Sequence, residues 1–137
     1  MGTVYAEITL KNVGDVVRIK EGLIQEQNVR KTLVTAVVDT GTMHLIISEA
    51  VCKKLDLEIQ ETKEATLANN AKEICKIAEP VEIHWKQRKS VCRPWVLSGT
   101  DEVLLGVIPL EDMDLIVDPV KQELAGCHGD KEIAMIY

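Results

Sequence analysis

The sequence contains no phenylalanine, and aromatic residues make up only 3% of its 137 residues. A core that lacks large rings must be filled by aliphatic side chains, and the β-branched ones, Val and Ile, favour strands. Hydrophobic residues still amount to 46% of the chain, which at this length is enough to bury a core without disulfides or metal ions. We therefore expect one folded, mostly β domain over residues 1–137.

The chain also lacks a surplus of positive charge, since 16 basic and 22 acidic residues give a net charge of −6. Nucleic acids and anionic membranes attract positive potential, so neither is expected as a partner. No apolar run approaches the roughly 18 residues that span a bilayer, and residues 1–10 do not form a signal-peptide pattern. Cys52, Cys75, Cys92 and Cys127 form no C-x-x-C pair, and we interpret them as reduced thiols of a cytoplasmic protein.

The order of apolar and polar residues predicts mostly strands. Single strands are expected at 3–10, 16–23, 29–38, 45–47, 103–105 and 115–117, and hairpins at 62–77 and 81–97. A short helix should follow Ser48, which suits a helix N-cap, and another should contain Pro109 in its first turn.

Two short motifs carry the chemical signal. Asp39-Thr40-Gly41-Thr42 follows the apolar residues 36–38. The pattern predicts a strand with a carboxylate at its end, followed by a turn at glycine. Taken alone, such a turn is ordinary structure and identifies no site. The second motif, Leu104-Leu105-Gly106, ends another apolar strand and is followed by the second expected helix.

Taken together, these segments resemble the single-domain retropepsin-like aspartic proteases of cellular genomes. Residues 5–10 resemble the opening strand of that family, and 36–42 its active-site loop. Residues 45–57 resemble the strand and helix that follow, 66–74 the flap hairpin, and 103–118 the closing strand, helix and strand. The resemblance implies a closed β-barrel of the retroviral acid-protease type, with two short helices and a flap.

The resemblance also implies an aspartic endopeptidase that cleaves peptide or protein substrates without a cofactor or metal. Such enzymes activate water between two carboxyl groups. Because two carboxyl groups about 3 Å apart cannot both be ionised, one acts as the base and the other remains an acid. This chain has one Asp-Thr-Gly. The resemblance therefore implies a two-fold symmetric homodimer in which each subunit contributes Asp39.

The family's other site residues carry over to matching positions. In the family, the hydroxyl at Thr40 links the two loops across the dimer axis, Gly41 allows close backbone approach, and the strand containing Leu104, Leu105 and Gly106 supports the loop. Thr42 stands where retroviral enzymes usually have alanine. A hydroxyl there can donate to Asp39 and favour its ionised form, so we expect a more acidic pH optimum than in an alanine-bearing relative.

The expected flap tip and substrate cleft consist of Leu67, Ala68, Asn69, Asn70 and Ala71. This tip contains neither glycine nor an aromatic residue, so it is expected to open less freely than the family's flaps. The alternative interpretation is a catalytically weak or inactive protease-like module for dimerisation or peptide binding. A third, a metal-dependent hydrolase that uses carboxylates and His44, predicts loss of activity with a chelator.

Other features are given plainer interpretations. His44 is expected to be a hydrogen-bonded, partly buried side chain. The adjacent pair Cys127-His128 has no metal-ligand spacing, so no metal site is expected there. The basic residues 86–89 are interpreted as a solvated hairpin tip, and Trp85 and Trp95 as core or cleft residues. The apolar residues 133–137 are expected to join a dimer sheet.

Overall fold

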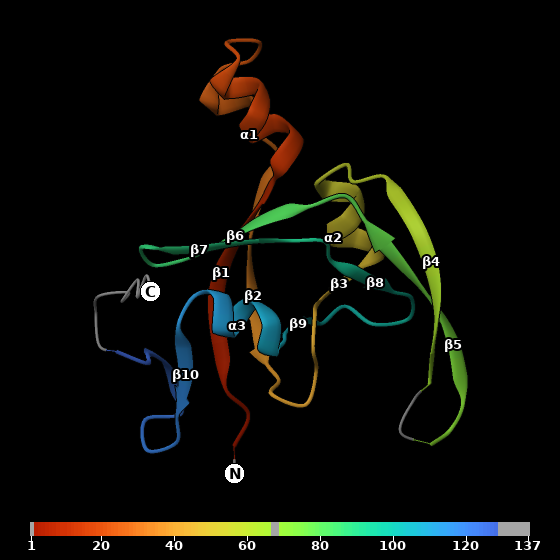
Figure 1. Ribbon diagram of the computed structural model, residues 1–137, viewed down its shortest axis with the longest axis vertical. Coiled ribbons are helices and arrows are strands. Elements are labelled where there is room, and N and C mark those ends of the chain that lie inside the picture. Colours follow the sequence, from red (N-terminus) through yellow and green to blue (C-terminus); the bar gives the residue numbers. More distant parts are fainter. Residues whose placement is uncertain (1, 67–68, 129–137) are drawn as a thin grey trace, which may run out of the picture.

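Figure 1 shows the computed structural model of the chain, a curled sheet that carries short helices. The structure describes residues 2–66 and 69–128. In this part of the chain the helices are α1 (Val13–Lys20), α2 (Glu49–Lys54), α3 (Val107–Asp112) and the 3-10 turn η1 (Glu26–Asn28). The strands are β1 (Tyr5–Asn12), β2 (Lys31–Val38), β3 (Leu45–Ser48), β4 (Ile59–Thr66), β5 (Lys72–Ala78), β6 (Val81–Trp85), β7 (Arg88–Cys92), β8 (Trp95–Leu97), β9 (Val103–Leu105), β10 (Leu115–Asp118) and β11 (Glu123–Gly126).

Nine of the strands form one sheet, in the order β4-β5-β8-β3-β9-β2-β1-β6-β7. Among the described residues β4 and β7 are its two edges, so the sheet is a curled half-barrel and the expected closed barrel is not seen (Figure 1). Strands β10 and β11 pair separately as a two-stranded sheet. The mostly β class is confirmed, and the number of α-helices is three in the described residues, not the expected two.

The centre of the large sheet positions the predicted motifs. Strand β9 lies between β2 and β3, parallel to β2 and antiparallel to β3. The register pairs Val38 at the end of β2 with Leu105, and Leu105 in turn with Leu45. The Asp-Thr-Gly loop that follows β2 therefore lies beside the end of β9.

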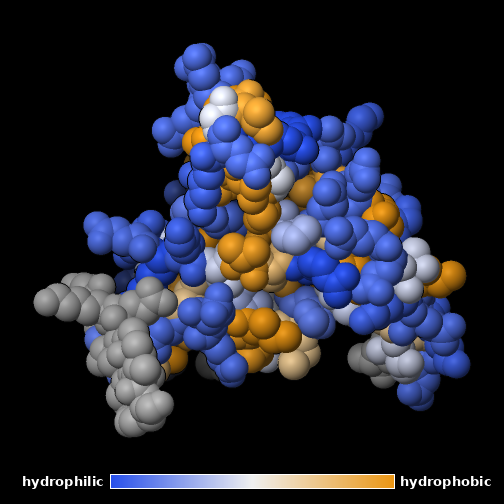
Figure 2. Space-filling model, turned by 45° about the horizontal axis from the view of Figure 1, so that its top comes forward, coloured by the Kyte–Doolittle hydropathy of each residue, from blue (hydrophilic) through white to orange (hydrophobic). Residues whose placement is uncertain are grey.

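The core is mostly aliphatic, as the lack of phenylalanine requires. Ile8, Leu10, Leu45, Ile47 and Leu105 are completely buried. Figure 2 shows hydrophilic side chains around the outside of one face and hydrophobic ones gathered toward its middle. No helix in the described residues is both long and apolar enough to cross a membrane.

The predicted strand at 16–23 is wrong, because these residues belong mainly to helix α1. The Asn12 side chain accepts a hydrogen bond from the Asp15 backbone N–H at 3.1 Å and caps the helix. At the other end Gly22 adopts a left-handed φ of 74°, and the Leu23 N–H donates to the carbonyl of Arg18 at 2.9 Å. These caps outweigh the strand preference of the β-branched residues between them.

Most other elements agree with the sequence. The strands at 29–38, 45–47, 103–105 and 115–117 and the hairpin at 62–77 are confirmed. Ser48 caps α2 as expected, since its hydroxyl accepts the Val51 N–H at 3.2 Å. The second hairpin turns after Trp85, which pairs with Arg88, and residues 95–97 form the separate strand β8. The expected interface segment 133–137 lies outside the described residues.

A buried carboxylate holds α1 against the start of β2. Asp15 is 2% exposed, and its two oxygens accept hydrogen bonds from Arg18 Nη1 at 2.7 Å and from Arg30 at Nε, Nη2 and the backbone N–H at 2.8–2.9 Å. These bonds, those from the Arg30 side chain first, hold the pKa of Asp15 well below its usual range. The ionised form is therefore the one that stabilises the fold.

We expect Asp15→Asn to lower the free energy of unfolding by about 2 kcal/mol at pH 7, because an amide cannot match the charge of two arginines. A depressed folded-state pKa stabilises the protein above the unfolded value near 4, and the stabilisation is lost as pH falls below it. The parent and the variant should thus differ less in free energy of unfolding at pH 3 than at pH 7, by about 1 kcal/mol. Urea unfolding at the two pH values measures this change.

The matched control is Asp56→Asn, because Asp56 also contacts Arg30 but its side chain is 76% exposed. That change should cost no more than about 0.5 kcal/mol. Equal losses from the two substitutions would contradict the special role of Asp15.

Candidate active site

The Asp-Thr-Gly loop begins directly where β2 ends. The backbone N–H of Asp39 donates to the carbonyl of Leu105 at 3.0 Å, so the parallel pairing of β2 with β9 extends to the acid itself. The N–H of Thr42 then donates to the carbonyl of Asp39 at 3.1 Å and closes a turn. Both the position and the direction of Asp39 are thus set by main-chain bonds.

Both carboxylate oxygens of Asp39 accept hydrogen bonds from within the loop. Oδ1 accepts the Gly41 N–H at 2.9 Å, and Oδ2 accepts the hydroxyl of Thr42 at 2.8 Å. Asp39 itself is half-buried, whereas Thr40 and Gly41 are exposed. A carboxylate held by two donors has a fixed orientation, and its remaining lone pairs are available to a further donor such as water.

Gly106 lets the loop pack against the end of β9. A Cβ at this position would lie 2.4 Å from the carbonyl oxygen of His44 and 2.6 Å from that of Thr42, which are backbone atoms. At the start of α3 the Val107 N–H donates to the Thr42 carbonyl at 2.8 Å, and the Ile108 N–H to the Met43 carbonyl at 2.9 Å. The segment after Asp39 is therefore held from both β9 and α3.

His44 follows this loop, and its ring is half-buried. It stacks on the indole of Trp95, with centroids 4.6 Å apart and planes 11° apart. Burial, together with the ammonium of Lys63, lowers the pKa of His44 and so favours the neutral ring. No sequence pattern predicts this stack, because it depends on the parallel pairing of Ile46 with Trp95.

The fold of the chain is similar to that of solved protein structures. The crystal structure of the retroviral protease-like domain of Ddi1 from Leishmania major matches the chain with a TM-score of 0.55, over 91% of this chain and 88% of that one. The chain has a retropepsin-like fold. Sequence identity in this match is 12%, so the likeness concerns the fold. No protein-family model and no curated protein matches the sequence.

Within this retropepsin-like fold, the predicted flap tip lies between β4 and β5. Asn70 has a left-handed φ of 64°, and the Ala71 N–H donates to Asn69 Oδ1 at 3.0 Å. An asparagine pair thus provides the turn that glycine often makes. Leu67 and Ala68 lie outside the described residues.

The fold brings together some of the predicted site residues within one chain. Asp39, Gly41 and Thr42 share hydrogen bonds, and Leu105 and Gly106 contact their backbone. Leu104 lies between β2 and β3, paired with Val37 and Ile46. Residues 1–137 contain a single Asp-Thr-Gly, so one chain brings one such carboxylate to this site.

Proposed function

We propose that the protein is an aspartic endopeptidase in which two Asp39 carboxylates, one from each subunit of a homodimer, activate water against a peptide bond. The observation that supports this best is the carboxylate of Asp39, oriented by Gly41 and Thr42 at the end of β2 in a chain with a retropepsin-like fold. No cofactor takes part in the proposed reaction.

The proposed chemistry needs one ionised and one protonated Asp39. The ionised carboxylate takes a proton from water as the water oxygen attacks the peptide carbonyl carbon, and the protonated one donates to the carbonyl oxygen. Collapse of the tetrahedral intermediate breaks the C–N bond, and the leaving amine receives a proton from the pair. The two carboxyl groups are equivalent in a symmetric dimer, so the asymmetric substrate decides which one acts as the acid.

The other loop residues have proposed supporting roles. Thr40, which is exposed in the single chain, would hydrogen-bond across the dimer axis, and Gly41 would allow the two loops to approach. An extended substrate would lie as an added strand beneath the flap at residues 67–71, with side-chain pockets that select its sequence.

The test is cleavage of a diverse peptide library between pH 3 and pH 7. We expect cleavage that a transition-state-mimicking aspartic-protease inhibitor blocks and that a chelator leaves unchanged. Activity per chain should fall on dilution through the dimer dissociation range, since half a site has one carboxylate. A folded dimer that binds peptides without cleaving any would contradict the protease and favour the alternative, a protease-like binding or dimerisation module.

A narrower prediction concerns the hydroxyl of Thr42. Thr42→Ala removes the donor to Asp39 Oδ2 and leaves the carboxylate with the Gly41 N–H alone, so kcat/KM should fall about fivefold because Asp39 is less firmly oriented. The measurement is kcat/KM against pH for one cleaved peptide. Thr35→Ala, an exposed threonine on β2, is the control, and superimposed profiles for Thr42→Ala and parent would reject the idea.

A further inference from the structure

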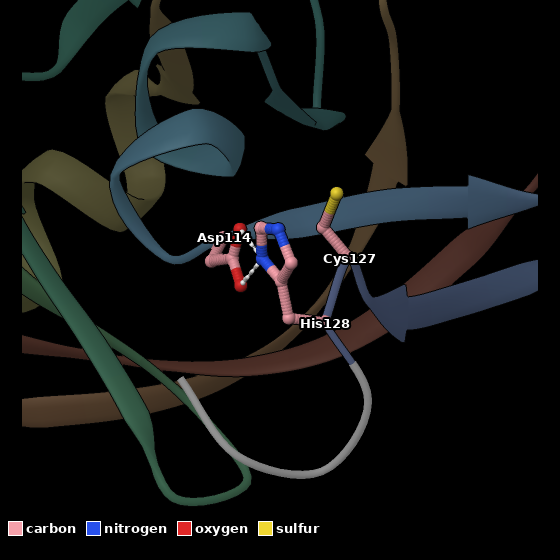
Figure 3. A group of neighbouring side chains, drawn as sticks. All are labelled: Asp114, Cys127 and His128. Atoms are coloured by element: carbon pink, nitrogen blue, oxygen red, sulfur yellow. Dashed lines mark hydrogen bonds and ion pairs between the residues drawn. The ribbon is translucent and has the colours of Figure 1, made fainter. Parts of the chain in front are cut away.

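Three side chains of the kinds that bind zinc meet at one end of the β10–β11 hairpin (Figure 3). Asp114 directly precedes β10, and Cys127 and His128 directly follow β11. The backbone N–H of Cys127 donates to the carbonyl of Asp114 at 2.8 Å, next to the paired residues Leu115 and Gly126. The two segments are thus fixed side by side by main-chain bonds.

The distances between these side chains approach those of a metal site. One ligand atom from each residue can be chosen so that all three lie within 4.8 Å of one another. Ligands of a tetrahedral zinc ion, at about 2.0–2.3 Å from the metal, lie roughly 3.5 Å apart, so small side-chain rotations would close the site. The imidazole of His128 already faces the carboxylate, with Nδ1 2.8 Å from Asp114 Oδ2.

The surroundings hold Asp114 firmly while leaving the site accessible. The buried guanidinium of Arg88 donates through Nη1 to the carbonyls of Met113 and Asp114 at 2.8 and 2.7 Å, which fixes the backbone beside the carboxylate. The same Nη1 lies 3.8 Å from Asp114 Oδ2, and this charge opposes a cation. Cys127 and His128 are exposed, so an ion can reach them from solvent and water can complete its coordination.

We propose that Asp114, Cys127 and His128 bind one Zn²⁺ ion per chain, with water as a fourth ligand. Thiolate, imidazole and carboxylate are the three ligand types that zinc takes in proteins, and the thiolate disfavours Mg²⁺ and Ca²⁺. The site is separate from the Asp39 loop in sequence, and its existence does not depend on the proposed protease activity. Its expected effect is to tie the end of β11 to the start of β10.

The sequence alone predicts no metal site at Cys127 and His128. Cys127-His128 has no metal-ligand spacing of its own, and the third ligand comes from the other strand of the hairpin. The carboxylate becomes relevant only once the register of β10 and β11 is known.

The test uses the full chain after removal of metal with a chelator and under reducing conditions. Titration with Co²⁺ should give a thiolate-to-cobalt charge-transfer band that saturates at one ion per chain, and Zn²⁺ should displace it. Zn²⁺ at 100 times its Kd should raise Tm by about 8 °C, because the ion binds the folded state.

The variants distinguish this site from chance binding. Cys127→Ser should abolish the band, and His128→Asn and Asp114→Asn should each weaken Zn²⁺ binding about 100-fold. Asparagine tolerates the left-handed φ of 56° at position 114, so Asp114→Asn should keep the fold. Cys75→Ser and His84→Asn, a buried thiol and an imidazole on other strands, should leave binding unchanged.

Three results would overturn the proposal. These are the absence of a charge-transfer band, a band that persists in Cys127→Ser, and saturation at half an ion per chain with a shift to a larger species. The last would mean that exposed thiols of two molecules share the ion, and size-exclusion chromatography with and without Zn²⁺ detects it.

Discussion

Asp39→Asn is expected to lower the rate of peptide cleavage by about 10³-fold or more while leaving the chain folded. The amide oxygen of asparagine can still accept the Gly41 N–H, and its NH₂ group can donate to the Thr42 hydroxyl oxygen, so the loop geometry should survive. It cannot take a proton from water or cycle between acid and base. The measurement is kcat/KM on a cleaved peptide, with circular dichroism and the urea midpoint as checks on folding.

The matched control for this change is Asp112→Asn, which neutralises an exposed carboxylate at the end of α3. It should leave kcat/KM within about twofold, because it alters the net charge of the chain by the same amount without touching the loop. Mixing the parent with an excess of Asp39→Asn should also suppress activity, since mixed dimers would contain one carboxylate. Full activity of the purified Asp39→Asn protein would exclude the carboxylate-pair mechanism.

Gly106→Ala should have the largest effect on stability, lowering the free energy of unfolding by about 3 kcal/mol or more. The new Cβ would lie 2.4–2.8 Å from three backbone atoms of Thr42 and His44, and backbone cannot move aside as a flexible side chain can. The loop at residues 42–44 would have to move away from the end of β9. Urea unfolding of parent and variant measures the loss directly.

Gly22→Ala is the control for a glycine whose role is conformational. Nothing lies within 4 Å of a Cβ there, but φ is +74°, so alanine should cost about 1 kcal/mol through backbone strain alone. A clearly larger loss at Gly106 would identify close packing as the cause. Equal losses of unfolding free energy in Gly106→Ala and Gly22→Ala would mean that the loop can shift to accommodate a Cβ. Gly106 would then not be required for its packing.

The sequence predicted the central part of the fold because local and long-range signals agree there. The apolar runs before Asp39 and Gly106 predict strands, and the pairing of these strands follows from the resemblance to retropepsins. The Ser48 cap could also be predicted, because a single side chain determines where α2 begins.

Other elements depend on information that a linear pattern does not carry. The β-branched residues of α1 favour a strand, and the caps at Asn12 and Gly22, together with the buried Asp15 pair with Arg30, select the helix. Strand β11 has four residues, of which only Leu124 is buried, and it forms because it pairs with β10. The stack of His44 on Trp95 likewise exists only through sheet register.

The position of β9 between β2 and β3 has a consequence for how the chain folds. Strand β2 can pair with β1 as soon as residues 5–38 are available, but its other neighbour begins at Val103. Contacts between residues so distant in sequence form slowly, because a long loop must close first. The hydrogen bond from Asp39 to Leu105 is therefore expected among the late events, and partly folded chains would carry the acid without the geometry that could make it reactive.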